Sequence, residues 1–307
     1  MSMSRLNEVP EQSIKGPARV VTASGNHCLI VDDAGGLRRC RPRRRRDPRP
    51  VCGDRVCWSA DEPDGWIDSI QPRRNLIERG DFRGRPRGLA ANVDRIVLVI
   101  APEPAPDALL VDRYIVLGKA LDIPLLLWCH KQDLASAAES LPVHAIQRRC
   151  DAMAIPVMAG STHDPDALAR LQTATRDETL ILVGQSGVGK SSITQALVPT
   201  ANRRIGQISA SSGQGRHTTS ETTLFDRPDG GALIDSPGVR TLRLDHLPPS
   251  AVDAAYPVIA EAIRHCRFND CRHDTEPDCG IRKGIAAGRI DPEALQRWQR
   301  LREETAS

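Results

Sequence analysis

A glycine-rich segment that also carries a lysine and several hydroxyl side chains occupies residues 184–192 and has the sequence GQSGVGKSS. Glycines let backbone N–H groups converge on an anion without a Cβ in the way, and a helix that follows adds its positive N-terminal end. Lys190 has the spacing to reach the outer phosphates of a nucleoside triphosphate, and Ser191 the spacing to bind Mg²⁺. The apolar run at residues 180–183 before the segment and the helix-like run at 192–198 after it suit a phosphate-binding loop. The predicted nucleotide contacts in this loop are Gly184, Gln185, Ser186, Gly187, Val188, Gly189, Lys190, Ser191 and Ser192.

A second phosphate-side element is expected where an apolar run ends in an aspartate. Residues 232–238 have the sequence ALIDSPG, so Asp235 can enter the Mg²⁺ shell and the Gly238 N–H can meet a γ-phosphate. The turn is common by itself, but its position after a phosphate loop indicates a GTPase.

Between these two elements lies a segment rich in glycine and serine, residues 209–219. Such a composition suits a switch loop that Mg²⁺ and the γ-phosphate order, and either Thr218 or Thr219 would complete the Mg²⁺ shell. A plain flexible linker is the alternative.

A base-reading box, His130-Lys131-Gln132-Asp133, follows the apolar run at residues 124–128. Asp133 can accept hydrogen bonds from guanine, and the Lys131 stem can cover the base. A backbone amide of residues 159–161 is placed to meet the guanine oxygen. After Asp235 we find no strand that ends in such a box, so the sheet is complete only if its last strands come first in the sequence, which is a circular permutation. His130 departs from the usual Asn or Thr, which leaves an ATPase or a chance surface box as alternatives.

Four potential metal ligands, Cys266, Cys271, His273 and Cys279, lie within 14 residues, whereas the other six cysteines are scattered. Three thiolates and one imidazole fit a closed tetrahedral Zn²⁺ site, which is structural because no position is left open. His273 is preferred to His265 because it falls inside the cluster. Buried cysteines without a metal are the alternative.

The elements that must position these residues follow from the apolar pattern. Short β-rich runs up to about residue 77 predict a small barrel, with an arginine-rich loop that holds eight arginines between Arg38 and Arg49. From about residue 92, buried strands alternate with helices, which predicts a parallel α/β sheet. The segments 251–264 and 292–303 are expected to be helical, the second capped by Asp291 with Pro292 at its first position.

Bulk composition limits the class of protein. The 307 residues are 40% apolar and only 3% aromatic, with a net charge of +3 and nine cysteines. No run is long enough to span a bilayer, which predicts a reduced, soluble, intracellular protein without a membrane partner.

Taken together, these residues resemble the RsgA family, circularly permuted GTPases that act in late maturation of the small ribosomal subunit. The matches are GQSGVGKSS at 184–192, GRHTT at 215–219, DSPGVR at 235–240 and the Cys266, Cys271, His273 and Cys279 set. The resemblance covers nearly the whole chain. It implies an N-terminal OB-like β-barrel that binds RNA (1–80), a circularly permuted P-loop GTPase domain (81–242) and a C-terminal helical zinc-binding domain (243–307).

The resemblance also implies the activity and the partners. We expect a monomer that binds the 30S subunit and 16S rRNA and hydrolyses GTP, with Mg²⁺, faster when bound there. Val239 stands where many GTPases have a water-orienting Gln, and the family's proposed substitute corresponds to His217, which could instead only dock the loop. The arginine-rich run could contact rRNA or be a solvated loop. A rival from another class is an RNA-binding assembly factor that uses its nucleotide site as a switch with little hydrolysis.

Overall fold

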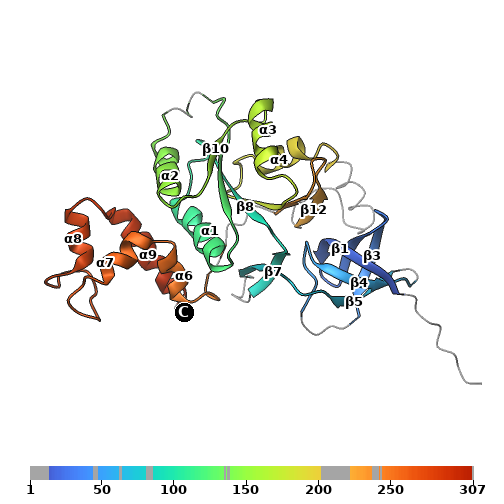
Figure 1. Cartoon of the computed structure of the whole chain (residues 1–307), viewed down its shortest axis with the longest axis horizontal. Helices are drawn as coiled ribbons and strands as arrows, with labels where there is room; N and C mark the ends of the chain where they lie inside the picture. Colours follow the sequence, from blue (N-terminus) through green and yellow to red (C-terminus); the bar gives the residue numbers. More distant parts are fainter. Residues whose placement is uncertain are drawn as a thin grey trace, which may run out of the picture.

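The computed structural model describes residues 14–43, 48–61, 64–80, 86–134, 136, 139–201, 222–236, 242 and 244–305. These residues form three parts in a row along the longest axis of the molecule (Figure 1). A β-barrel lies at one end, a six-stranded sheet with its helices lies in the middle, and a group of helices lies at the other end.

The N-terminal strands close into a barrel with the order β1-β2-β3-β5-β4. Val20, Ile30 and Val56 are fully buried in its interior, because alternate residues of a strand point to one face. Its one parallel pair, β3 with β5, fits an OB-like barrel, and the predicted barrel is therefore confirmed. The strands are β1 (Ile14–Ser24), β2 (His27–Asp32), β3 (Leu37–Pro42), β4 (Arg55–Ser59) and β5 (Gly65–Ile70).

The arginine-rich run differs from its prediction. Its first part is strand β3 rather than a loop, and residues 44–47 lie outside the described part of the chain. Cys40 faces Cys28 across the ladder and is buried, while Arg41 beside it is exposed. Pairing with β2 and β5 supplies the backbone hydrogen bonds of β3. The strand therefore forms although its arginine side chains do not favour a β-strand by themselves.

A two-stranded sheet that the sequence pattern did not predict connects the barrel to the middle of the molecule. It consists of β6 (Leu76–Gly80) and β7 (Pro86–Ala91). A bridge between Cys52 and Ala90 attaches it to the segment before β4. The expected boundary at residue 80 thus falls inside a hairpin.

The central sheet has the order β10-β9-β8-β11-β13-β12. All neighbours are parallel except β12, which runs antiparallel to β13. Strands β8, β9 and β10 precede the strand of the phosphate loop in sequence but complete the sheet beyond it, so the predicted circular permutation is confirmed. The strands are β8 (Arg95–Ile100), β9 (Leu125–Cys129), β10 (Val157–Ala159), β11 (Thr179–Val183), β12 (Thr223–Asp226) and β13 (Ala232–Asp235).

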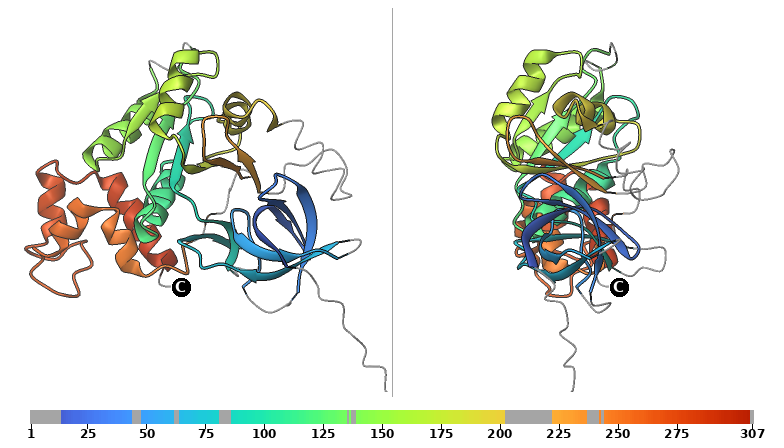
Figure 2. Two further views of the ribbon diagram at one scale, coloured as in Figure 1. Left: turned by 45° about the vertical axis from the view of Figure 1, so that its right-hand side comes forward. Right: turned by 90° about the vertical axis from the view of Figure 1, so that its right-hand side faces the viewer.

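Helices cover both faces of this sheet (Figure 2). Alternate residues of β8 belong to two different cores: Leu98 packs with α1 (Ala108–Ala120) and α2 (Leu141–Ala152), and Val99 packs with α3 (Pro165–Ala174) and α4 (Lys190–Leu197). This double burial explains the continuous apolar runs of the strands. Asp107 caps α1 by accepting from the N–H groups of Leu109 and Leu110, and Asp164 caps α3.

The C-terminal part is helical, as predicted, but the first of the two expected helices is divided. The expected helix over 251–264 is two helices that break at Tyr256, because proline disfavours helical backbone in the residue before it. Helix α8 was not predicted, and α9 begins where Asp291 accepts from the Glu293 N–H. The helices are α6 (Pro249–Ala254), α7 (Pro257–Ile263), α8 (Gly280–Ala286) and α9 (Pro292–Thr305). No helix in the described part of the chain combines the length and apolar character needed to cross a bilayer.

A buried carboxylate joins these helices to the central sheet. Asp112 on α1 is 1% exposed and accepts hydrogen bonds from Arg149, Tyr256 and Arg297. The Arg297 Nε lies 2.9 Å from Asp112 Oδ2. Arg149 comes from α2, Tyr256 from the junction between α6 and α7, and Arg297 from α9. The buried Asp112 carboxylate therefore connects α1 to α2 and to the C-terminal part.

Candidate functional site

The predicted phosphate loop lies between β11 and α4, as its sequence requires. Gly184 has φ +140°, and a Cβ there would lie 2.2 Å from the carbonyl oxygen of Val99. Gly189 has φ +101° and caps α4. Both positions require glycine, because side-chain-bearing residues avoid this backbone region. Within the loop, Ser186, Ser191 and Ser192 are exposed, whereas Val188 is fully buried and can offer a ligand only its backbone.

Lys190 folds back over this loop. Its Nζ donates hydrogen bonds to the carbonyl oxygens of Gly184, at 2.8 Å, and Gln185, at 2.7 Å. Burial lowers the pKa of Lys190, and the nearby Asp235 carboxylate opposes that shift. Backbone carbonyl oxygens therefore hold the ammonium group in place. Phosphate oxygens can replace them as acceptors of its hydrogen bonds.

Asp235 ends β13 directly beside the phosphate-loop strand, where it pairs in register with Leu182. The residue is 8% exposed, and this burial raises the pKa of its carboxyl to about 6, against the opposing effect of Lys190. Gly238 lies outside the described residues, as do His217, Thr218 and Thr219. Among the described residues, Asp235 and Lys190 thus form the charged pair at the phosphate end.

Asp235→Asn is expected to stabilise the nucleotide-free protein at neutral pH. A carboxyl whose folded pKa is raised contributes stability below its unfolded pKa and loses that contribution as pH rises through the folded value, here about 6. The amide removes the buried charge, so we expect a gain of about 1–3 kcal/mol at about pH 7.5 and little difference at about pH 4. Urea denaturation at both pH values measures it. The exposed Asp166→Asn is the matched control, and equal stability of Asp235→Asn and wild type at neutral pH would contradict a buried carboxylate.

The predicted base-reading box follows β9 and contacts the phosphate loop. Lys131, with φ +58°, donates from Nζ to the carbonyl oxygen of Gly187 at 2.8 Å and to that of Glu103 at 2.7 Å. Gln132 donates from its backbone N–H to the carbonyl of Gly160, at 3.3 Å. His130 is buried at 3% exposure. The fold therefore brings residues 130–133 against residues 184–192, although they lie far apart in the chain.

Asp133 is exposed and already has partners. Hydrogen bonds from Ser161 and from His163, whose Nδ1 lies 3.1 Å from Asp133 Oδ2, lower the pKa of this carboxyl. Ser161 belongs to the segment expected to meet the base, but His163 was not predicted. A histidine two residues after that segment was the available signal. Asp133 is therefore an ionised acceptor at the surface, as a reader of guanine N–H groups needs to be.

A loop after β8 also borders the site and was missed by sequence reasoning. The backbone N–H of Asp107 donates to Gln185 Oε1 at 2.9 Å, and Pro104 lies next to Gly187. Its position after a parallel strand could have predicted this, because ligands bind at the carboxyl ends of the strands in such sheets.

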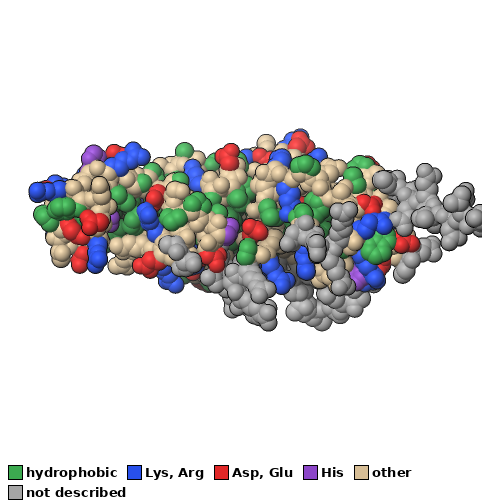
Figure 3. Space-filling model, turned by 90° about the horizontal axis from the view of Figure 1, so that it is seen from below, with side chains coloured by type: hydrophobic (Ala, Val, Ile, Leu, Met, Phe, Trp, Pro, Cys, Tyr) green, Lys and Arg blue, Asp and Glu red, His purple; other side chains and the backbone are tan. Residues whose placement is uncertain are grey.

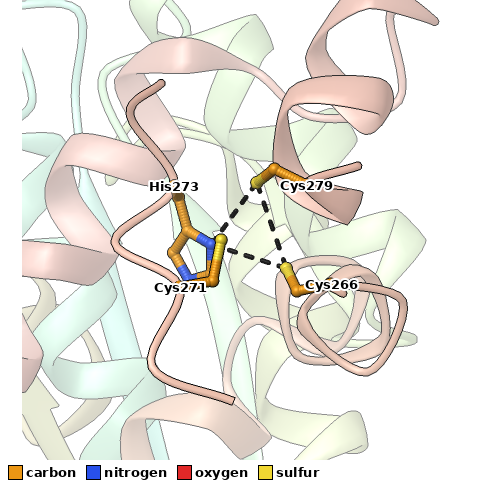
Figure 4. A group of neighbouring side chains, drawn as sticks. All are labelled: Cys266, Cys271, His273 and Cys279. Carbon is orange, nitrogen blue, oxygen red and sulfur yellow. Dashed lines mark hydrogen bonds between the residues drawn. The ribbon is translucent and has the colours of Figure 1, made fainter. Parts of the chain in front are cut away.

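The four predicted metal ligands converge in the C-terminal helices (Figure 4). Their ligand atoms all lie within 4.8 Å of one another. Cys266 Sγ is 3.9 Å from Cys279 Sγ and 3.6 Å from His273 Nδ1, which is itself 3.5 Å from Cys279 Sγ. Tetrahedral ligands with Zn–S bonds of about 2.3 Å would lie about 3.8 Å apart, so the spacing fits such a site. Burial lowers the pKa of His273, which favours the neutral imidazole that a metal needs.

Local backbone features explain this convergence. A Cβ on Gly280 would lie 2.0 Å from the carbonyl oxygen of Ala262, so only glycine lets the start of α8 meet the end of α7. That approach places Cys279 beside Cys266. The competing His265 points elsewhere, with Nε2 3.2 Å from Glu261 Oε1.

Comparison with known proteins agrees with this geometry. The family model described as RsgA GTPase matches residues 70–245. The "Small ribosomal subunit biogenesis GTPase RsgA" of Azotobacter vinelandii is 39% identical over 269 residues, which are 87% of this chain and 78% of that protein. The protein of the same name from Pseudomonas aeruginosa is 36% identical over 293 residues, 95% of this chain and 85% of that protein.

Two solved structures share the fold. YjeQ from Thermotoga maritima superposes with a TM-score of 0.69 at 22% identity, over 95% of this chain and 99% of that one. YloQ, described as a circularly permuted GTPase, superposes with a TM-score of 0.64 at 25% identity, over 98% of both chains. The family model and the curated relatives, which match most of the chain, show that it is a GTPase and belongs to the RsgA GTPase family.

Proposed function

We propose that this GTPase acts in late maturation of the small ribosomal subunit, where it binds the 30S particle and hydrolyses GTP to GDP and phosphate. The observation that carries the proposal is the 39% identity, over 87% of this chain, to a protein named for small ribosomal subunit biogenesis. Binding to the particle is proposed to stimulate hydrolysis. The protein would then work as a monomer in the cytoplasm, where ribosomes are assembled.

The nucleotide site is proposed to be the region where the base-reading box meets the phosphate loop. Asp133 would accept from guanine while the Lys131 stem covers the base. The backbone of residues 184–189 and the Lys190 ammonium would hold the phosphates. Mg²⁺ would be held by Ser191, Asp235 and a threonine, Thr218 or Thr219, and would neutralise phosphate charge. The Gly238 N–H would meet the γ-phosphate.

His217 is the proposed catalytic residue. It belongs to the segment that resembles the family pattern, and Val239 offers no polar group to orient water. An imidazole there would position the attacking water once the loop is ordered.

The four-ligand cluster is proposed to hold one structural zinc ion. Three sulfur ligands and one nitrogen are the donor set that zinc prefers, and no position remains for a water or a substrate. The support is the mutual spacing of the four ligand atoms. When bound, the ion would cross-link α7 to α8 through the loop between them.

Contact with rRNA is proposed to involve the barrel. Arg41 on β3 is exposed, and the Arg43 guanidinium lies 5.6 Å from the centre of the Trp66 ring. Asp64 and Asp68 pair with these arginines, so an RNA phosphate would compete with carboxylates. Among the described residues on the face shown in Figure 3, acidic and basic side chains are interspersed.

Three functional units are proposed: residues 1–80 for RNA contact, 81–242 for GTP and 243–307 for zinc. The barrel and the nucleotide unit are joined by an ion pair between Arg19 and Asp226. Asp226 ends β12, the strand that follows the proposed switch loop. The barrel is thus linked to the strand that follows the proposed switch loop in the chain.

The test is steady-state GTP hydrolysis with and without purified 30S subunits. We expect a low intrinsic rate that rises at least about tenfold with 30S subunits but not with 50S subunits. His217→Ala should lose about 10²-fold of the stimulated rate while GTP affinity is unchanged. Absence of any 30S effect would refute the proposed function. A slow, unstimulated turnover with tight 30S binding would favour the rival, a switch with little hydrolysis.

A further inference from the structure

The ring of His130 lies directly on the phosphate loop. A Cβ at Gly189 would lie 2.4 Å from His130 Cδ2 and 2.8 Å from its Nε2. The ring therefore fills the space above Gly189, and Gly189, with φ +101°, is the residue that leads into Lys190. His130 is 3% exposed, and its backbone N–H is fixed to the carbonyl of Ile100 at 2.8 Å. The imidazole is thus a packed part of the site rather than a surface side chain.

Trp128 sets the orientation and the protonation of that ring. Its Nε1 lies 3.3 Å from His130 Nδ1, and both residues are buried. An indole N–H can only donate, so His130 Nδ1 accepts and the proton of the neutral ring is on Nε2. The nitrogen that carries the proton is therefore the one that lies on the phosphate loop.

Trp128 in turn reaches the base-reading side of the site. A Cβ at Gly160 would lie 2.9 Å from the Cη2 atom of the Trp128 ring. Gly160 immediately precedes Ser161, the residue that hydrogen-bonds Asp133. A continuous set of packed groups, Gly160, Trp128, His130 and Gly189, therefore runs from the base-reading end to the phosphate end. We call it the Trp128–His130 link.

We propose that His130 is a positioning residue for nucleotide binding, which through the Trp128–His130 link sets the distance between the base-reading loops and the phosphate loop. The proposal rests on the proposed nucleotide site. His130 performs this role through the packing of its ring against Gly189. The Trp128 indole, which orients the ring, then compensates for the presence of His130 at the first position of the box.

The link makes nucleotide binding sensitive to acid. Burial lowers the pKa of His130; Asp133 raises it, Lys131 and His163 lower it, and a contact with the Gly160 backbone raises it. The neutral ring thus persists at neutral pH and below its ordinary pKa of 6.5. Protonation would place an N–H on Nδ1 against the indole N–H, so that two donors face each other. The ring would be pushed away from Trp128, and its packing on Gly189 would be disturbed.

The experiment measures the affinity for fluorescent GDP between about pH 5 and pH 8, in magnesium-free buffer without chelator. Omitting Mg²⁺ removes the metal-linked titration of Asp235, and omitting chelator leaves the cysteine cluster intact. Wild type should lose affinity on the acid side, below the ordinary histidine pKa of about 6.5. His130→Ala should bind GDP at least about tenfold more weakly at neutral pH. In a separate turnover assay with Mg²⁺, the loss should be in KM for GTP rather than in kcat.

Trp128→Phe is the decisive variant, because it keeps an aromatic ring in the core and removes the indole donor, together with the part of the ring that contacts Gly160. Relative to its own affinity at neutral pH, this variant should lose less GDP affinity than wild type on the acid side, since protonated His130 no longer meets an indole N–H. A merely structural role for Trp128 would leave the pH profile in place. His144→Ala on α2 is the control for histidine replacement.

The outcomes separate this inference from the proposed function. If wild type binds GDP but His130→Ala binds equally well, or if Trp128→Phe has an unchanged pH profile, the inference is wrong and the ribosomal proposal stands. If wild type binds no guanine nucleotide, the proposed site and the inference both fail. If only 30S stimulation is absent, the ribosomal proposal fails and the inference is upheld by its own binding data.

Discussion

Lys190→Ala is expected to lower kcat/KM for GTP by at least about a thousandfold, equivalent to about 4 kcal/mol of transition-state stabilisation. The Lys190 ammonium is buried and held by two loop carbonyls, at 2.8 Å from Gly184 and 2.7 Å from Gln185. Phosphate oxygens would replace those weak acceptors with full negative charge, so the charge-assisted contacts form only with the nucleotide bound. Isothermal titration with GDP measures the loss of nucleotide affinity, and single-turnover hydrolysis measures the loss of the catalytic rate.

The same substitution should leave the folded state intact. Burial disfavours the Lys190 charge and lowers its pKa, while the Asp235 carboxylate favours the charge, so these two effects on the nucleotide-free fold oppose each other. We expect the free energy of unfolding to change by less than about 1 kcal/mol. Lys119→Ala, at an exposed lysine near the end of α1, is the matched control and should bind and hydrolyse GTP like wild type. Near-normal turnover in Lys190→Ala would contradict the proposed phosphate site.

Cys279→Ser is expected to abolish binding of the proposed zinc ion and to unfold the loop between α7 and α8. Structural zinc supplies about 10–16 kcal/mol of apparent binding free energy in zinc-finger peptides at neutral pH, and a ligand pair of sulfurs 3.9 Å apart is not stable as two thiolates without a cation. Metal content per chain and hydrogen exchange over residues 264–286 measure the effect. Helix α9 should keep its protection, because Trp298 and Leu301 are buried in the core shared with α1.

Cys57→Ser in the barrel is the control for loss of a thiol, since Cys57 is only half-buried and lies in a different part of the molecule. That variant should keep one zinc per chain and normal exchange. Cys279→Ser should keep its GDP affinity, because the nucleotide loops lie on the central sheet and not among the C-terminal helices (Figure 1). A full complement of zinc in Cys279→Ser would remove this residue from the metal site.

Elements with a strong local signal agreed with the sequence. The phosphate loop lies between a buried strand and a helix, and the predicted cap Asp291 accepts a hydrogen bond from the Glu293 N–H at the start of α9. These features depend on residues a few positions apart, so spacing and residue type are sufficient to predict them.

Elements that depend on distant partners were missed or misread. Strand β3 carries arginines and is stable only because β2 and β5 pair with it. Hairpin β6–β7 and helix α8 likewise have weak patterns of their own. The break at Tyr256 was missed because the apolar period continues across it, although Pro257 gave a local signal.

The sequence by itself determined the kind of chemistry and the order of the motifs. It placed a phosphate loop, an aspartate at a strand end, a base-reading box and a set of metal ligands along the chain, and their order required a permuted sheet. Only the tertiary structure decided how these parts support one another. Lys131 reaches Gly187, His130 packs on Gly189, and burial raises the pKa of Asp235 to about 6. Such contacts and pKa shifts arise from burial and from distances between segments that meet only when the sheet forms, so spacing along the chain carries no information about them.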